Sequence, residues 1–145
     1  MVIVAGGNTY EQRDGTDGHD RYFYRRKTYE TLDSLEVLLV SDNIWTSGPK
    51  LETGRLEFGL GDMCGEVMAM GGRRYDGEYL SESHREGGVN GPVHWTHTVQ
   101  DNIQETFLDT IETLKGISWM ISGDKMPGPM ASFGVAKAPL SLCKV

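Results

Sequence analysis

The longest regular pattern in the chain is a stripe of apolar residues between Val99 and Ser122. The stripe consists of Val99, Ile103, Phe107, Ile111, Leu114, Ile117 and Ile121, which recur at steps of three or four. This is the 3.6-residue period of one helix face, whereas a half-buried strand alternates apolar and polar residues. Asp101 with Gln104 fits an N-terminal capping box, and Gly123 suits a helix end. We therefore predict a long helix over residues 101–122.

The opposite face of this predicted helix is polar and mostly acidic. It carries Gln104, Glu105, Asp109, Glu112 and Lys115. Exposure to solvent is the usual reason for such a face on a surface helix. A docking surface for a basic partner is the alternative.

Short apolar or alternating segments precede the predicted helix and are typical of strands. They cover residues 1–5, 21–28, 35–41, 55–60 and 93–99. Gly71-Gly72 separates two more such segments and has the character of a two-residue hairpin loop. Residues 29–39 fit a helix as well, because a short apolar run does not distinguish helix from strand. The polar, glycine-containing residues 11–20 predict a loop.

A series of strands followed by one helix favours an α+β fold. We predict a mainly antiparallel sheet of about five to seven strands packed by one long helix near the C-terminus, in a single domain over residues 1–122. Residues 123–145 contain prolines and glycines throughout, which predicts an irregular, extended C-terminal arm. This arm lies either along its own domain or on a neighbouring subunit.

The net charge of −7 argues against wholesale binding to a nucleic-acid backbone, which requires a positive footprint. It suits an acidic, soluble protein that meets a basic surface. No apolar run approaches the length of a membrane span, and the N-terminus lacks the pattern of a leader. We therefore expect a cytoplasmic protein in which Cys64 and Cys143 are reduced.

Basic and aromatic residues alternate at two places in this acidic chain. They are Arg21, Tyr22, Tyr24, Arg25, Arg26 and Lys27, and then Arg73, Arg74 and Tyr75. Such side chains can stack on bases and contact phosphates, so these residues are candidate binding residues. The alternative, which we favour for residues 21–28, is an edge strand whose charges prevent aggregation.

Residues that ligate metals are present, but their spacing fits no known motif. His94 and His97 would point to opposite faces of a strand, so a shared metal is not expected. Convergence of Glu82, His84 and His97 in three dimensions, and calcium binding by Asp14, Asp17 and Asp20, stay open. No catalytic motif occurs, and no cofactor is predicted.

The acidic charge, the extended arm and the lack of catalytic signatures predict a non-enzymatic protein-binding or assembly protein. It could be an acidic inhibitor, an immunity-type partner, or a subunit of a larger particle that forms a homo-oligomer. Binding of a nucleotide or single-stranded nucleic acid through the two Arg/Tyr clusters is the first alternative. A metal-dependent hydrolase is the second.

Overall fold

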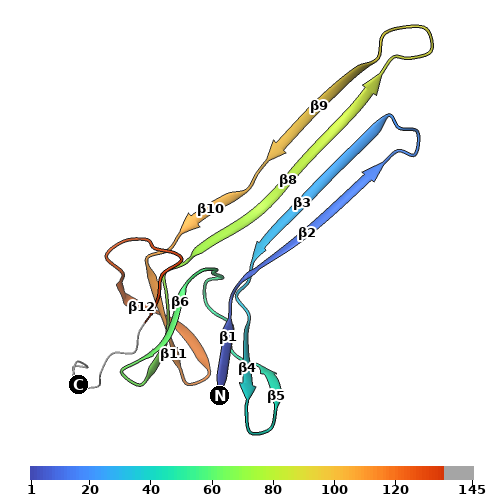
Figure 1. Cartoon of the computed structure of the whole chain (residues 1–145). Coiled ribbons are helices and arrows are strands. Elements are labelled where there is room, and N and C mark those ends of the chain that lie inside the picture. The colour runs from blue at the N-terminus through green and yellow to red at the C-terminus, as the bar shows by residue number, and fades with distance from the viewer. Residues whose placement is uncertain (136–145) are drawn as a thin grey trace. The chain divides into compact units, whose positions relative to one another are not determined.

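A computed structural model describes residues 1–135. These residues contain no helix and form β-strands in three antiparallel sheets (Figure 1). The strands are β1 (Val2–Ala5), β2 (Asn8–Thr16), β3 (Tyr22–Thr31), β4 (Leu35–Leu39), β5 (Ile44–Ser47), β6 (Gly59–Met63), β7 (Glu66–Met70), β8 (Arg73–Glu86), β9 (His94–Asp101), β10 (Gln104–Phe107), β11 (Thr110–Lys115) and β12 (Ser118–Lys125). The predicted α+β fold is therefore wrong, and the protein is all-β.

The segment predicted as a long helix contains the end of β9, all of β10 and β11, and the first part of β12. β11 and β12 form a hairpin in which Lys115 is opposite Ser118, and Gly116 in the turn has a φ of 62°. A glycine adopts this left-handed conformation without steric cost. The segment is also rich in Thr and Ile, which favour strands. These local preferences outweigh the 3.6-residue stripe.

The chain divides into two compact units. Unit 1 contains Met1–Asn8, Thr31–Arg74 and the residues from Glu105 onwards, and unit 2 contains Thr9–Glu30 and Tyr75–Gln104. Two sheets, with orders β1-β4-β5 and β12-β11-β7-β6, belong to unit 1. The third has the order β10-β8-β3-β2, with β9 also paired to β8.

Unit 1 contains the hydrophobic core. Its buried apolar side chains are Leu35, Leu51, Ala69 and Trp119, against which Ile3, Val37, Phe58, Leu60, Val67 and Leu114 pack. Each of these apolar residues removes surface from water and so contributes to stability. Phe133 and Val135 lie close to Gly59 and Gly61 of β6, so the chain beyond β12 returns to its own unit as far as residue 135.

An ion pair between Arg55 and Glu112 is fully buried in unit 1. The Arg55 guanidinium also donates to the carbonyl oxygen of Gly71, with Nη1 and O 2.8 Å apart. The Glu112 carboxylate accepts hydrogen bonds from the amides of Glu52 and Thr53, at 2.8 and 3.0 Å. The placement of Glu112 on a solvated face was therefore wrong: its charge is compensated inside the protein.

Unit 2 is a sheet formed by β2, β3, β8 and the edge strand β9 (Figure 1). Tyr22 of β3 is opposite His84 of β8, which is opposite Thr96 of β9. No residue of unit 2 is buried, and every residue of β9 is exposed. All the buried residues among 1–135 belong to unit 1.

Several strand predictions are confirmed, among them residues 1–5, 21–28, 35–41 and 93–99. The loop predicted for residues 11–20 is wrong for residues 11–16, because β2 continues to Thr16, and is confirmed for residues 17–20, which connect β2 to β3. The helical alternative for residues 29–39 is wrong as well, since this segment contains the end of β3 and all of β4.

Gly71-Gly72 does not connect a hairpin. β7 pairs with β6 and β11, whereas β8 pairs with β3 and β9. The hairpin turn lies instead at Cys64-Gly65 between β6 and β7, where both residues have positive φ. β3 is also not an edge strand, because it lies between β2 and β8.

Cysteine pairing differs from the expectation for Cys64. This residue takes part in a disulfide, and residues 1–135 contain no free cysteine. Cys143 and the last residues of the predicted arm, 136–145, lie outside the described residues. The prediction of a reduced thiol is therefore wrong for Cys64.

Replacement of one partner of the buried ion pair should destabilise the protein strongly. Glu112→Leu leaves the Arg55 guanidinium without its countercharge, and the free energy of unfolding should fall by about 3–5 kcal/mol. Urea unfolding followed by tryptophan fluorescence measures this loss. Asp109→Ala, which breaks the exposed pair with Lys125, is the control and should cost at most about 1 kcal/mol. Equal effects of the two substitutions would contradict the role of the buried pair.

Candidate interaction surface of unit 2

Two different faces result from the strand register of unit 2, because residues directly opposite one another in antiparallel strands share a face. One face, called the aromatic face, carries Phe23, Arg25, Lys27, Tyr29, Tyr79, Ser81, Ser83, Arg85, Trp95, His97, Val99 and Asp101. The other, called the acidic face, carries Tyr22, Tyr24, Arg26, Thr28, Glu78, Leu80, Glu82, His84, Glu86, His94, Thr96, Thr98 and Gln100.

Aromatic rings gather on the aromatic face but remain open to solvent. The rings of Phe23 and Trp95 have centroids 5.9 Å apart, although these side chains belong to β3 and β9. Phe23 is 40% exposed, Trp95 46% and Val99 57%. Tyr29 contacts the rings of both Tyr10 and Tyr75. Exposed apolar groups gathered in this way are typical of an interaction surface.

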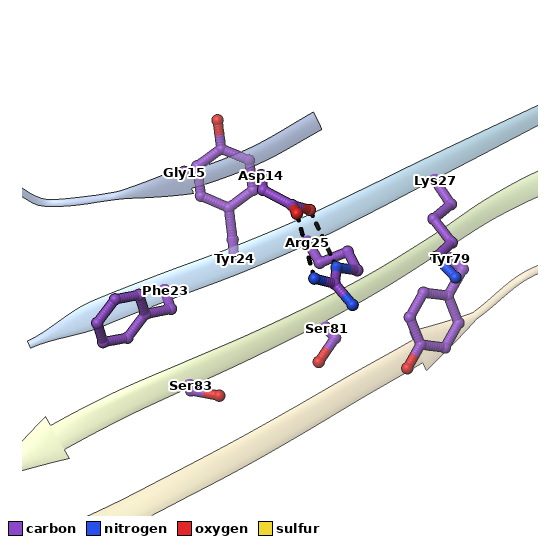
Figure 2. A pocket seen from close by; sticks show the side chains of 9 residues that line it. All are labelled: Asp14, Gly15, Phe23, Tyr24, Arg25, Lys27, Tyr79, Ser81 and Ser83. Carbon is purple, nitrogen blue, oxygen red and sulfur yellow. Dashed lines mark hydrogen bonds and ion pairs between the residues drawn. The ribbon is translucent and has the colours of Figure 1, made fainter. Parts of the chain in front are cut away.

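A hollow of about 350 Å³ lies on the aromatic face (Figure 2). Ser81 and Ser83 occupy two successive positions of β8 on this face, and their short side chains leave the space open. Phe23 and Tyr79 stand at its sides in Figure 2. The hollow is large enough for a bulky side chain or a small ligand.

The cations of the aromatic face differ in their partners. The Arg25 guanidinium donates to Asp14 of β2, with Nε and Oδ1 3.0 Å apart, and this hydrogen bond lowers the pKa of Asp14 below its ordinary value. The Lys27 ammonium lies 5.7 Å from the centroid of the Tyr79 ring. Arg85 lies across from Trp95. Counted over β3, β8 and β9, three cations and one carboxylate, Asp101, share this face.

The acidic face has the opposite balance. Glu78, Glu82 and Glu86 of β8 share it with one guanidinium, Arg26, when β3, β8 and β9 are counted. Arg26 pairs with Glu78 at 3.4 Å. The Tyr22 hydroxyl donates to the Glu82 carboxylate, which raises the pKa of Tyr22.

No family model and no curated protein matches the chain. A function must therefore be inferred from the chemistry of these two faces.

The structure divides the predicted binding residues. Arg25 and Lys27 lie on the aromatic face, whereas Tyr22, Tyr24 and Arg26 lie on the acidic face. Arg21 precedes β3, and its carbonyl oxygen accepts a hydrogen bond from the Arg85 amide. The first Arg/Tyr cluster is therefore not one continuous surface.

The second predicted cluster is divided in the same way. Arg73 and Arg74 belong to unit 1, and Tyr75 belongs to unit 2. Arg73 forms ion pairs with Glu57 and Glu105, and these hydrogen bonds raise its pKa and lower that of Glu57. The charge of Arg73 is thus balanced within unit 1.

The proposed metal ligands are not brought together. Glu82 and His84 lie on the acidic face, whereas His97 lies on the aromatic face and contacts the Ser83 hydroxyl at 2.7 Å. His94 and His97 point to opposite faces, as predicted. Within residues 1–135, no three His, Cys, Asp or Glu side chains are placed to hold a metal ion, and this includes Asp14, Asp17 and Asp20.

The sequence correctly predicts which residues of β9 share a face, but it does not predict that the whole strand is exposed. Alternation in residues 93–99 correctly places Trp95, His97 and Val99 on one face. A face with two apolar residues such as Trp95 and Val99 would normally pack in a core, but every residue of β9 is exposed. The contributions of Ser81 and Ser83 were also missed, because the polar residues 81–92 predict a loop, whereas β8 continues to Glu86.

The pKa of Asp14 should depend on its ion pair with Arg25. The ion pair lowers the pKa of Asp14 in the folded protein. The stability that the pair contributes is therefore fully present above the pKa of Asp14 in the unfolded chain. It is lost as the pH falls through the lowered pKa of the folded protein. In Arg25→Gln the pKa of Asp14, measured by NMR titration, should rise towards the ordinary value of about 3.9. Arg26→Gln, on the acidic face, is the control. An unchanged Asp14 titration in Arg25→Gln would refute the pairing.

Proposed function

We propose that this chain is a non-enzymatic assembly protein and that its unit 2 is the part that becomes buried against other protein. One observation carries the proposal: unit 2 is an ordered sheet in which no residue is buried. Sheets in folded proteins normally cover at least one face. A sheet with two uncovered faces is therefore incomplete as a folded unit.

The energetics point in the same direction. Ordering the backbone costs about 1–2 kcal/mol per residue, and burial of apolar surface is the main compensation. Unit 1 has this compensation in Trp119, Leu35 and their neighbours. Unit 2 has cross-strand contacts between exposed or half-buried side chains, and none of its residues is buried. Contact with a protein surface supplies the missing burial, and Phe23, Trp95 and Val99 are among the exposed apolar groups that would gain from it.

Binding of a nucleotide or single-stranded nucleic acid is the second candidate. The exposed rings of Phe23 and Trp95 stand on the same face as Arg25 and Lys27, and stacked aromatic rings with nearby cations can hold single-stranded bases. The net charge of −7 and the pairing of Arg25 with Asp14 weigh against this candidate.

Salt-dependent binding of a labelled oligonucleotide tests the second candidate. Binding on the aromatic face should be weakened by Arg25→Ala and left unchanged by Arg26→Ala, which lies on the acidic face. Absence of binding at low salt, or equal loss in both variants, would exclude this site.

The described part of the chain has no helix with the length and apolar character needed to cross a membrane. A cytoplasmic location stays a prediction from the sequence. The proposed assembly function does not depend on it.

Association should protect unit 2 from hydrogen exchange. Over a roughly hundredfold range of protein concentration, the mass measured by sedimentation should rise, and amides of residues 75–101 should slow as it does. Amides of β11 and β12 in unit 1 serve as the internal control and should change little. A chain that stays monomeric, with amides of unit 2 protected as strongly as those of unit 1, would overturn the proposal.

A further inference from the structure

We propose that the aromatic face of unit 2 binds the acidic face of unit 2 in a second copy of the chain, so that the sheets of successive copies stack. This inference rests on the proposed assembly function. It further specifies that the partner is a second copy of the chain and that unlike faces meet. The argument depends on the charges, the apolar groups and the hollow of the two faces.

Charge complementarity is the first step. After Arg25 is paired with Asp14, Lys27 and Arg85 remain as cations of the aromatic face that form no ion pair among residues 1–135. After Arg26 is paired with Glu78, the carboxylates of Glu82 and Glu86 remain on the acidic face. Opposite potentials on two faces of the same module allow one copy to attract the next.

Shape and apolar area supply the second step. The aromatic face offers Phe23, Trp95 and Val99, together with the hollow above Ser81 and Ser83. The acidic face presents the side chains of Tyr22, Tyr24 and Leu80, which are half-buried within the sheet. Large amphipathic side chains such as tyrosine are favoured at the centres of protein interfaces. Contact between the faces would remove the apolar groups of both from water.

The alternative of two aromatic faces packed on each other is disfavoured by charge. That contact would place Lys27 and Arg85, the cations without an ion pair among residues 1–135, against the same two cations of the other copy. Like charges brought together at an interface oppose association. Contact between unlike faces is heterologous, so each copy keeps one unused face, and association continues until a ring closes or a filament grows.

Charge reversal tests this orientation in the full chain. Lys27→Glu removes a cation of the aromatic face, and Glu82→Lys removes a carboxylate of the acidic face. Each variant alone should weaken self-association about tenfold, measured by sedimentation at low salt. Asp42→Lys, at an exposed position in the turn after β4, makes the same charge change as Glu82→Lys, but in unit 1, and should leave association unchanged.

Mixing the two variants gives the decisive result. In the mixture, the altered aromatic face of Lys27→Glu can meet the altered acidic face of Glu82→Lys, and the two unaltered faces can meet each other. Association should therefore recover towards the wild-type level in the mixture. Packing of aromatic face on aromatic face predicts a different outcome, in which Glu82→Lys alone has no effect.

The outcomes also separate this inference from the assembly function on which it rests. A wild-type chain that associates with protection of unit 2, but without recovery in the mixture, would overturn the stacking and leave the assembly function standing. A wild-type chain that stays monomeric at all concentrations would overturn both. Association that depends on added oligonucleotide would also overturn the stacking, because it would assign the aromatic face to nucleic acid.

Discussion

The buried ion pair between Arg55 and Glu112 is the interaction on which unit 1 depends. Its hydrogen bonds join the segment at Glu52 and Thr53 to Gly71 and to β11. These segments lie on either side of the long excursion of the chain through residues 75–104. Moving one of these segments away from the others would leave a buried charge without its partner, which is strongly destabilising.

The two units differ in how much of their side-chain surface they bury. Unit 1 encloses Trp119, Leu51 and a compensated pair of charges. In unit 2 no residue is buried, so among residues 1–135 nothing covers either face of the sheet. Alternation usually marks an inner and an outer face of a sheet. In unit 2 both faces are open to solvent, and they differ instead in their side chains, because one face is basic and aromatic and the other is acidic.

The sequence carried enough information for several strands but not for the fold class. Alternation identified residues 21–28 and 93–99, and it placed His94 and His97 on opposite faces. The apolar stripe after Val99 led to the wrong prediction of a helix, because its period is that of a helix face. Gly116 and the threonines of the same segment favour the hairpin that the structure contains. Pairing of Arg55 with Glu112 could not be read from the chain, since residues so far apart leave no local pattern. For the same reason, the hollow formed by Ser81 and Ser83 became visible only with the pairing of β8.

Unit 2 consists of two chain segments, Thr9–Glu30 and Tyr75–Gln104. For each segment, the residues of unit 1 that come before and after it are close together. The amide of Leu32 donates to the carbonyl oxygen of Gly7, and the amide of Leu108 donates to that of Gly72, each at 2.9 Å. Each excursion of the chain therefore leaves unit 1 and returns to it between residues whose backbones are hydrogen-bonded to each other. Insertion of an even number of residues into a hairpin arm would extend both faces, whereas an odd number would exchange them from that point onwards. The reach of the arms can therefore evolve in steps of two residues while the chemistry of each face is retained.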